Sequence, residues 1–312
     1  MNIISDINNV AVTVPCVQTI GGFDGLHLGH QYLLQQVRDT ARKRGMKSMV
    51  ITFRHHPSFT LRPDKPVAIL TTLEEKLHLL QQMDIDYTAV LDFTPQMSQM
   101  SARIFMEQVL KEKLCGQALL IGYDHHFGHS SHDSFADYQR YGTALGIEVV
   151  QALELPPSNG RHVSSSAIRN ALAEGEVTLA QQMLGRPYSI EGIVTHGEGI
   201  GHKLGFPTAN IEPSDPQKIL PKHGAYAVKA FIEGQAFPAM LYIGNRPTFN
   251  NLNALRIEAH LLDFEGDIYG SRLRVEFVDF LRGEHHFSSP LDLEKQLHSD
   301  LHTVRDLIKN NN

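Results

Sequence analysis

The segment GGFDGLHLGHQYLL, residues 21–34, lies between a β-branched run and an amphipathic run, and it decides the fold. Residues 12–20 (VTVPCVQTI) before it predict a strand. After it, one apolar face and a closing Gly45 predict a helix; that face holds Leu33, Leu34, Val37 and Ala41. A glycine-rich turn between a strand and a helix is typical of a βαβ unit, in which ligands bind at the carboxyl ends of the strands.

The rest of the first half repeats this alternation of strands and helices. Strands are expected at 46–53, 86–92, 118–124 and 147–153, and helices near 73–83, 101–114 and 134–145. Strands separated by helices of this length indicate an α/β domain with a parallel sheet.

From about residue 188 the pattern changes to short β-branched or aromatic runs with turn residues between them. These runs are SIEGIVTH, AYAVKAFI, FPAMLYIG, RIEAHLLDF and RLRVEFVDFL. They predict an antiparallel sheet or a small barrel, and a final helix is expected after Ser289-Pro290. The 312 residues suit two or three domains. LGRP (184–187) is the predicted joint between domains 1–185 and 186–312, because glycine and proline stop helices.

Composition argues against several classes of protein. The formal net charge of -6 argues against coating of nucleic acid or of an anionic membrane. No stretch approaches 18 uninterrupted apolar residues, and the start MNIISDINNV lacks the order of a signal peptide. Cys16 and Cys115 are too few for a disulfide framework, which fits a reducing compartment. We therefore expect a cytoplasmic protein, a monomer or weak homo-oligomer, with no nucleic acid and no membrane among its partners.

His27 and His30 lie three residues apart at the start of the first predicted helix. A helix N-terminus offers unpaired amides and a partial positive charge to a phosphate, and the preceding glycines permit close approach. The segment is neither a Walker A loop nor a GxGxxG fingerprint. Each histidine could instead be an ordinary cap or packing residue. We interpret HxGH here as the signature of nucleotidyltransferases, whose reaction requires positioning and charge neutralisation rather than a covalent nucleophile.

A second candidate phosphate contact lies in HVSSSAIRNAL, residues 162–172. The three serines at 164–166 can cap a helix and donate hydrogen bonds from their hydroxyls. Arg169 in the first turn can reach a triphosphate. The alternative is an ordinary serine-capped surface helix.

A further candidate site lies in the second half, beginning with the glycine-rich stretch THGEGIGHKLGFPTAN, residues 195–210. Such a loop can cover phosphates, or it can be only a turn. Thr208 and Asn210 offer two oxygens suited to Mg²⁺ that is held partly by a nucleotide. Alternation in RIEAHLLDF places Glu258 on one face with Arg256 and His260. Glu258 can accept a hydroxyl proton during phosphoryl transfer, or it can be a solvated carboxylate on an exposed face.

These motifs together resemble the family of bifunctional bacterial riboflavin kinases/FMN adenylyltransferases over nearly the whole chain. Other matching stretches are TFRHHP, TTLEEKL, IGYDHHFG, LGRPYSIEGIV, IGNRPTF and DIYG…LRVEFVDFLR. The resemblance implies an α/β, Rossmann-like nucleotidyltransferase domain followed by a six-stranded antiparallel β-barrel kinase domain with a C-terminal helix. It also implies that the C-terminal domain phosphorylates riboflavin to FMN with ATP and Mg²⁺, and that the N-terminal domain adenylylates FMN to FAD and releases pyrophosphate.

The resemblance assigns roles to individual residues. His27 and His30 bind the ATP phosphates, Thr208 and Asn210 hold Mg²⁺–ATP, and Glu258 is the catalytic base facing the riboflavin 5′-hydroxyl. The remaining nucleotide and flavin contacts are Gly22, Phe23, Asp24, Asp124, Ser164, Ser165, Arg169, Gly197, Gly201 and Gly205.

One loop, DHHFGHSSHD at 124–133, departs from the family pattern DFRFGxxRxG, because His126 and Ser131 replace arginines. Its histidines allow a Zn²⁺ site, or a phosphate-adjacent loop in which partly protonated imidazoles replace the guanidinium groups. Two alternatives to the bifunctional enzyme remain. One is a nucleotidyltransferase for another phosphorylated acceptor, and the other is a flavin-binding regulator without catalysis.

Overall fold

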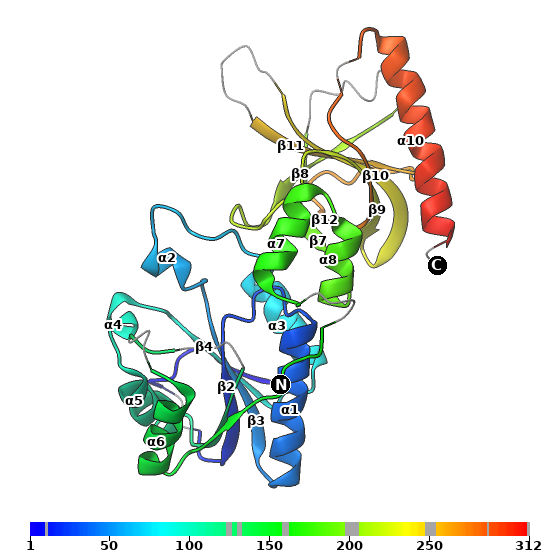
Figure 1. Ribbon diagram of the computed structural model, residues 1–312. Helices are drawn as coiled ribbons and strands as arrows, with labels where there is room; N and C mark the ends of the chain where they lie inside the picture. The colour runs from blue at the N-terminus through cyan, green and yellow to red at the C-terminus, as the bar shows by residue number, and fades with distance from the viewer. Residues whose placement is uncertain are drawn as a thin grey trace. The chain divides into compact units, whose positions relative to one another are not determined.

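Residues 1–165 form a parallel sheet covered by helices on both faces (Figure 1). The computed structural model describes residues 1–9, 12–122, 127–129, 133–157, 162–196, 206–246, 254–285 and 287–310. Their contacts divide the chain into two units, Met1–Ser165 and Ser166–Asn312.

The sheet of the first unit has the order β1-β4-β3-β2-β5-β6, with every pair of neighbours parallel. Its strands are β1 (Asn2–Ile4), β2 (Cys16–Ile20), β3 (Lys47–Phe53), β4 (Tyr87–Leu91), β5 (Gly116–Ile121) and β6 (Glu148–Gln151). The strand that follows β2 along the chain lies on one side of it, and β5 lies on the other. Chain connections therefore diverge at the carboxyl end of β2, the place where open α/β sheets bind ligands.

Seven helical segments connect these strands. They are α1 (Leu28–Lys43), α2 (Ser58–Leu61), α3 (Leu73–Gln82), α4 (Pro95–Ser98), α5 (Ala102–Phe105), the π-helix η1 (Met106–Lys111) and α6 (Phe135–Leu145). One face of the sheet packs against α5, η1 and α6, and the other packs against α1 and α3. Burial on both faces explains why β2 and β3 are buried at almost every position instead of alternating between buried and exposed side chains.

The predicted strands and helices of this half are confirmed, with differences of extent. The strand expected at 118–124 is β5 (Gly116–Ile121), and residues 123 and 124 lie outside the described residues. The edge strand β1 was not predicted. The strand expected at 12–20 is β2, which begins at Cys16, because Pro15 has no amide hydrogen and the ladder starts after it. The helix expected at 101–114 changes to π geometry at Met106. Buried Gln18 accommodates this change, since its amide nitrogen donates to the carbonyls of Leu110 (3.2 Å) and Leu114 (2.9 Å).

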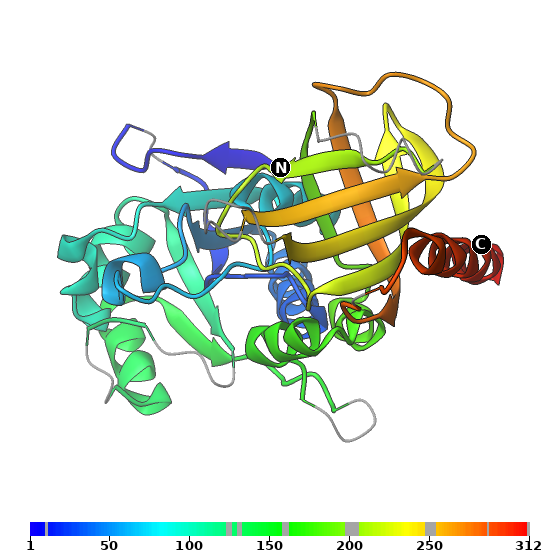
Figure 2. The same ribbon diagram turned by 90° about the horizontal axis from the view of Figure 1, so that it is seen from above.

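The second unit is a closed six-stranded barrel with the order β10-β11-β8-β7-β12-β9 (Figure 2). Its elements are α7 (Ser165–Glu174), α8 (Val177–Leu184), β7 (Ser189–Thr195), β8 (Ala209–Pro213), β9 (Gly224–Ile232), β10 (Gln235–Arg246), β11 (Ala254–Leu261), β12 (Arg272–Arg282) and α10 (Pro290–Asn310). The fold class inferred from the sequence, a Rossmann-like domain followed by an antiparallel barrel with a C-terminal helix, is thereby confirmed.

Helix α10 identifies the outer face of the barrel. Ala227 of β9 and Met240 of β10, which are partners in the ladder, pack against Val304 and Ile308 of α10. Side chains alternate along a strand, so residues an even number away from these two share their face. That outer face carries the second candidate site described below.

Within the parts of the chain that the structure describes, no helix combines the length and the apolar character needed to cross a membrane.

Candidate active sites

The loop between β2 and α1 has an unusual backbone. Phe23, Gly25 and Leu26 have φ values of +47°, +79° and +39°. A positive φ is costly for residues with a side chain and persists only where the surroundings enforce it. Buried Asp24 provides that restraint, because its carboxylate accepts hydrogen bonds from the backbone amides of Leu70 (2.9 Å) and Thr71 (3.0 Å).

His27 is the N-cap of α1, and its Nδ1 accepts a hydrogen bond from the backbone amide of His30 at 3.3 Å. The two imidazole rings stack with centroids 3.6 Å apart. Gly29 leaves room for this stack, since an added Cβ would lie 3.2 Å from the His27 ring. The HxGH spacing therefore places two imidazoles together at a helix N-terminus, where an anion is favoured.

A cavity of about 300 Å³ opens at this position, at the carboxyl ends of β2 and β5. Its lining includes Gly22, Phe23, His27, His30 and Ser164 from the predicted site. Asp24 and Ser165 act behind it, because the Ser165 hydroxyl donates to the Asp24 carbonyl at 2.8 Å and so holds the loop. Arg169 lies one turn after Ser165 on α7, and Asp124 lies outside the described residues.

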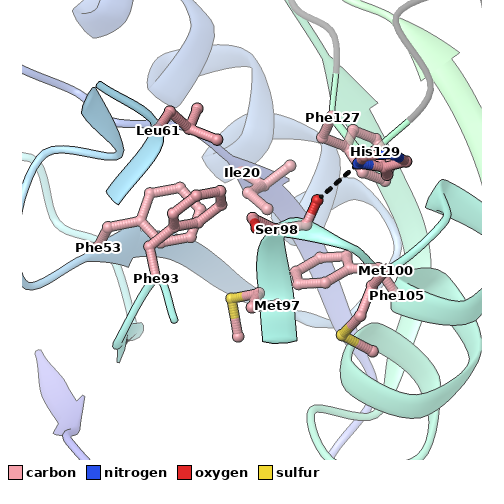
Figure 3. A pocket seen from close by; sticks show the side chains of 11 residues that line it. Ile20, Phe53, Leu61, Phe93, Met97, Ser98, Met100, Phe105, Phe127 and His129 are labelled. Carbon is pink, nitrogen blue, oxygen red and sulfur yellow. Dashed lines mark hydrogen bonds between the residues drawn. The ribbon is translucent and has the colours of Figure 1, made fainter. Parts of the chain in front are cut away.

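A second cavity, of about 200 Å³ and mainly apolar, lies beside the first and shares Ile20 with it (Figure 3). Leu61 and His129 lie in its wall, together with four phenylalanines and two methionines. The phenylalanines are Phe53, Phe93, Phe105 and Phe127, and the methionines are Met97 and Met100. Ile20 ends β2, Phe53 ends β3, and Phe93 follows β4. The same edge of the sheet therefore presents a phosphate-compatible cavity and an aromatic one.

Hydrogen bonds fix the aromatic wall. The Tyr138 hydroxyl accepts from the Phe127 amide (3.1 Å) and donates to its carbonyl (3.0 Å), while the Tyr138 and Phe127 rings stack. The backbone amide of His129 donates to the Met100 carbonyl at 2.8 Å. Gly128 is required between them, because at φ +91° an added Cβ would lie 2.6 Å from the Ala102 nitrogen.

No sequence motif marks this aromatic cavity. Its members are scattered between residues 20 and 129 and share no spacing. The sequence feature that could have indicated this cavity is the position of Phe53 and Phe93, each at the carboxyl end of a predicted parallel strand.

The second candidate site is a row of residues across the outer face of the barrel. Ladder partners join Thr195 to Asn210, Asn210 to Glu258, and Glu258 to Tyr242. Tyr242 lies two residues after Met240 and therefore faces the side covered by α10, and its ladder partner Glu258 faces that side too. The register thus brings the predicted base Glu258 beside the predicted metal ligand Asn210.

The flanking residues match the alternation predicted for β11. Glu258 is half-buried and its Oε1 lies 3.7 Å from Nη1 of Arg256, while Ile257 and Ala259 are buried on the opposite face. Half-buried Thr208 lies two residues before Asn210, next to Pro207, whose carbonyl is hydrogen-bonded to His260 at 2.8 Å. The predicted loop glycines Gly197, Gly201 and Gly205 lie outside the described residues.

Tyr242 extends the row towards the chain that precedes α10. Its hydroxyl donates to Glu284 Oε1 at 3.1 Å, and the same oxygen accepts from the Asn245 amide at 3.3 Å. Burial, followed by the Glu284 charge, raises the pKa of Tyr242 to about 12, so the phenol stays protonated. A Cβ added at Gly244 would overlap the Tyr242 hydroxyl oxygen and Glu284 Oε1, so a side chain there would displace these groups.

Among the described residues no group of three or more histidine, cysteine or acidic side chains is arranged to hold a metal ion. Of the four histidines in the departing loop only His129 is described, and its Nδ1 is 3.1 Å from the Ser98 carbonyl oxygen. His125, His126 and His132 lie outside the described residues, so the Zn²⁺ interpretation of that loop stays untested.

Comparison with known families assigns each unit separately. Residues 10–167 match the family model described as FAD synthetase, and residues 184–308 match that described as riboflavin kinase. The bifunctional riboflavin kinase/FMN adenylyltransferase of Escherichia coli (strain K12) is 35% identical over 309 residues, which cover 98% of this chain and 97% of the relative. The chain belongs to this family. The Pseudomonas fluorescens relative of the same name is 37% identical and covers 94% of this chain and 93% of its own length.

A solved structure agrees over the same extent. The crystal structure described as a macrolide-efflux protein from Streptococcus pneumoniae superposes with a TM-score of 0.87 at 29% identity, covering 97% of this chain and 98% of its own. That description is not carried over, because both family models and the curated relatives describe transferases over the same residues.

Proposed function

We propose that the chain makes FAD from riboflavin in two group-transfer reactions, one performed by the C-terminal part of the chain and one by the N-terminal part. The C-terminal part is a riboflavin kinase that forms FMN, and the N-terminal part is an FMN adenylyltransferase that forms FAD and pyrophosphate from FMN and ATP. The observation that carries this function is the pair of family matches, in that order, along one chain. The alternatives of a single transferase for another acceptor and of a non-catalytic regulator do not account for that pair.

In the N-terminal unit, we assign the larger cavity to ATP and the aromatic cavity to the flavin ring of FMN. The imidazoles of His27 and His30 and the α1 amides suit the triphosphate. The phenylalanines and methionines suit a planar apolar ring system. The shared wall at Ile20 supports the pairing, because the FMN phosphate must reach the α-phosphorus of ATP.

Adenylylation then requires alignment and charge neutralisation. A phosphate oxygen of FMN attacks the α-phosphorus of ATP, a new P–O bond forms, and the bond to pyrophosphate breaks. The two imidazoles and the helix N-terminus stabilise the charge that develops on the phosphates. Ser164 and Arg169 are the predicted further contacts of the triphosphate, with Gly22 and Phe23 shaping the loop.

In the barrel, Glu258 is positioned to act as the general base. The riboflavin 5′-hydroxyl gives its proton to the Glu258 carboxylate as its oxygen attacks the γ-phosphorus of ATP, and ADP leaves. Thr208, directly before β8, and Asn210, the ladder partner of Glu258, are both half-buried, and they offer a hydroxyl and an amide oxygen that suit Mg²⁺. Bound there, Mg²⁺ would neutralise phosphate charge.

The aromatic cavity gives a test of the flavin assignment. Phe93, whose ring lies edge-on to that of Phe53 at 5.2 Å, supplies part of the wall. Phe93→Ala should raise the KM for FMN about tenfold and leave the KM for ATP nearly unchanged, because one lost aromatic contact is worth about 1–3 kcal/mol. Steady-state kinetics of adenylylation measure both constants. Ile3→Ala, at an exposed apolar residue of β1, is the control; equal effects on both KM values would contradict the assignment.

The metal assignment predicts a selective change in magnesium dependence. Asn210→Ala should raise the Mg²⁺ concentration that gives half-maximal FMN formation by about tenfold, a change typical of losing one weak oxygen ligand. Magnesium titration of both half-reactions checks this, with adenylylation in the same molecule as the control. An unchanged titration of FMN formation would remove Asn210 from the site.

The proposal also covers the cellular location, the oligomeric state and the boundary between the two domains. We propose a cytoplasmic enzyme that acts as a monomer or weak homo-oligomer on small molecules, a choice supported by the net charge of -6 and by two free cysteines. The catalytic modules are proposed to meet near residue 185. The contact-based units divide earlier, after Ser165, and the family matches leave residues 168–183 unassigned.

The experiment that tests the function is direct. Purified protein is incubated with riboflavin, ATP and Mg²⁺, and flavins are separated by chromatography over time. FMN should appear first and FAD should follow, with FAD also formed when FMN replaces riboflavin. Absence of both products would overturn the proposed function.

A further inference from the structure

Lys76 of α3 is buried in the first unit although it carries an ionisable group. Its Nζ donates three hydrogen bonds, to the carbonyl of Gly22 (3.1 Å), the hydroxyl of Thr52 (3.1 Å) and the carbonyl of Phe53 (3.0 Å). An ammonium group has three donors, so all of them are used. Three neutral acceptors converging on one buried cation are a costly arrangement, because a leucine or methionine would fill the space without a desolvation penalty.

Two of the three acceptors belong to residues that line the two cavities. Gly22 lines the larger cavity and Phe53 lines the aromatic one. Thr52 lies between them, and its hydroxyl also donates to the Gly22 carbonyl at 3.2 Å. One ammonium group therefore connects the phosphate-binding loop after β2 to the end of β3, from which the flavin wall begins.

We propose that Lys76 is a positioning residue for adenylylation, which fixes the cavity for the ATP phosphates relative to the cavity for the flavin. Lys76 contacts neither ATP nor FMN and acts through its hydrogen bonds to Gly22 and Phe53. The proposal rests on the function proposed above. It adds that the relative placement of the two substrates depends on this one buried cation.

The chemistry explains why such a link matters. The FMN phosphate must meet the α-phosphorus of ATP in line, and a displacement of about 1 Å between reacting groups can reduce a rate by about 10²-fold. Each cavity is built mostly by its own residues and can bind its ligand without the link. Loss of the link should therefore reduce kcat much more than it raises either KM.

The test uses Lys76→Met in the full-length protein, with Lys43→Met as the matched control at an exposed lysine near the end of α1. The kcat for FMN adenylylation should fall by about 10²-fold in Lys76→Met, while the KM values for FMN and ATP stay within about threefold. Riboflavin kinase activity and all constants of Lys43→Met should match wild type. An unchanged kcat, or a rise in KM without a fall in kcat, overturns the proposal.

A second variant covers the case in which Lys76→Met fails to fold. Thr52→Val keeps the volume of a fully buried side chain and removes one acceptor of Lys76, together with the bond from Thr52 to Gly22. Its kcat for adenylylation should fall by about tenfold with KM values unchanged, as expected from partial loss of positioning. A thermal melt reports folding, and wild-type kcat in a folded Thr52→Val protein overturns the proposal. If wild type forms no FAD, the proposed function fails instead.

A pH profile adds a readout that packing alone would not change. Burial lowers the pKa of Lys76 to about 8, partly offset by the charge of Asp24, while the facing groups of β3 and Gly22 are neutral. Above that pKa the amine keeps two hydrogens and one acceptor loses its donor. The ratio of wild-type to Lys76→Met kcat should therefore decline from about pH 7 to about pH 9. A constant ratio contradicts a role for the ammonium form.

Discussion

Replacing Glu258 by glutamine should reduce FMN formation from riboflavin by about 10²–10⁴-fold, while FMN is still converted to FAD at the wild-type rate. Glutamine keeps the shape of the side chain and its place beside Asn210 but cannot take the hydroxyl proton. The two half-reactions are followed separately, one from riboflavin and one from added FMN.

Glu276→Gln is the matched control, because Glu276 is also a half-buried carboxylate on a barrel strand, beside Arg274, and lies outside the row that contains Glu258. It should retain kinase activity within about twofold, the range of an ordinary surface change. Loss of both half-reactions in Glu258→Gln would break the assignment of two separate sites, and full kinase activity would remove Glu258 as the base.

The second large effect is expected at His27. His27→Asn should lower adenylylation of FMN by about 10²–10³-fold, because it removes one imidazole from the triphosphate site. Asparagine remains a good N-cap, so α1 keeps an acceptor where Nδ1 of His27 receives the His30 amide. FMN formation in the barrel should be unchanged.

The control for that variant is His78→Asn, at an exposed histidine of α3 in the same unit. Both reactions of this control should match wild type. If His27→Asn adenylylates FMN normally, the stacked imidazoles do not bind the phosphates, and if it also loses kinase activity, the effect is on folding.

Local patterns predicted the parts of the fold that depend on local physics. Alternation along β11 placed Glu258 and Ile257 on opposite faces, and the structure agrees because side chains in a strand alternate strictly. The turn at residues 21–30 predicted a parallel sheet, since it joins a strand to a helix. The predicted start of the preceding strand at residue 12 was wrong, because Pro15 interrupts the ladder and β2 begins at Cys16.

Features that depend on distant contacts could not be predicted in this way. The aromatic cavity joins Phe53 to Phe127, which lie 74 positions apart in the sequence, and no spacing rule connects them. The burial of Lys76 could not be predicted from its helix, because its three acceptors are known only from the structure. Helix α7 belongs by contact with the barrel, where the Leu172 carbonyl accepts from the Lys222 amide at 2.9 Å.

Complementation between two inactive variants tests the central claim most directly. Glu258→Gln and His27→Asn are each given riboflavin, ATP and Mg²⁺, alone and mixed. Alone, each variant should form FAD at least about 10²-fold more slowly than wild type, since one makes little FMN and the other converts little FMN to FAD. The mixture should form FAD, because FMN released by the barrel of one variant reaches the intact adenylylation site of the other. FAD formed near the wild-type rate by either variant alone, or no faster by the mixture than by the single variants, would contradict the account.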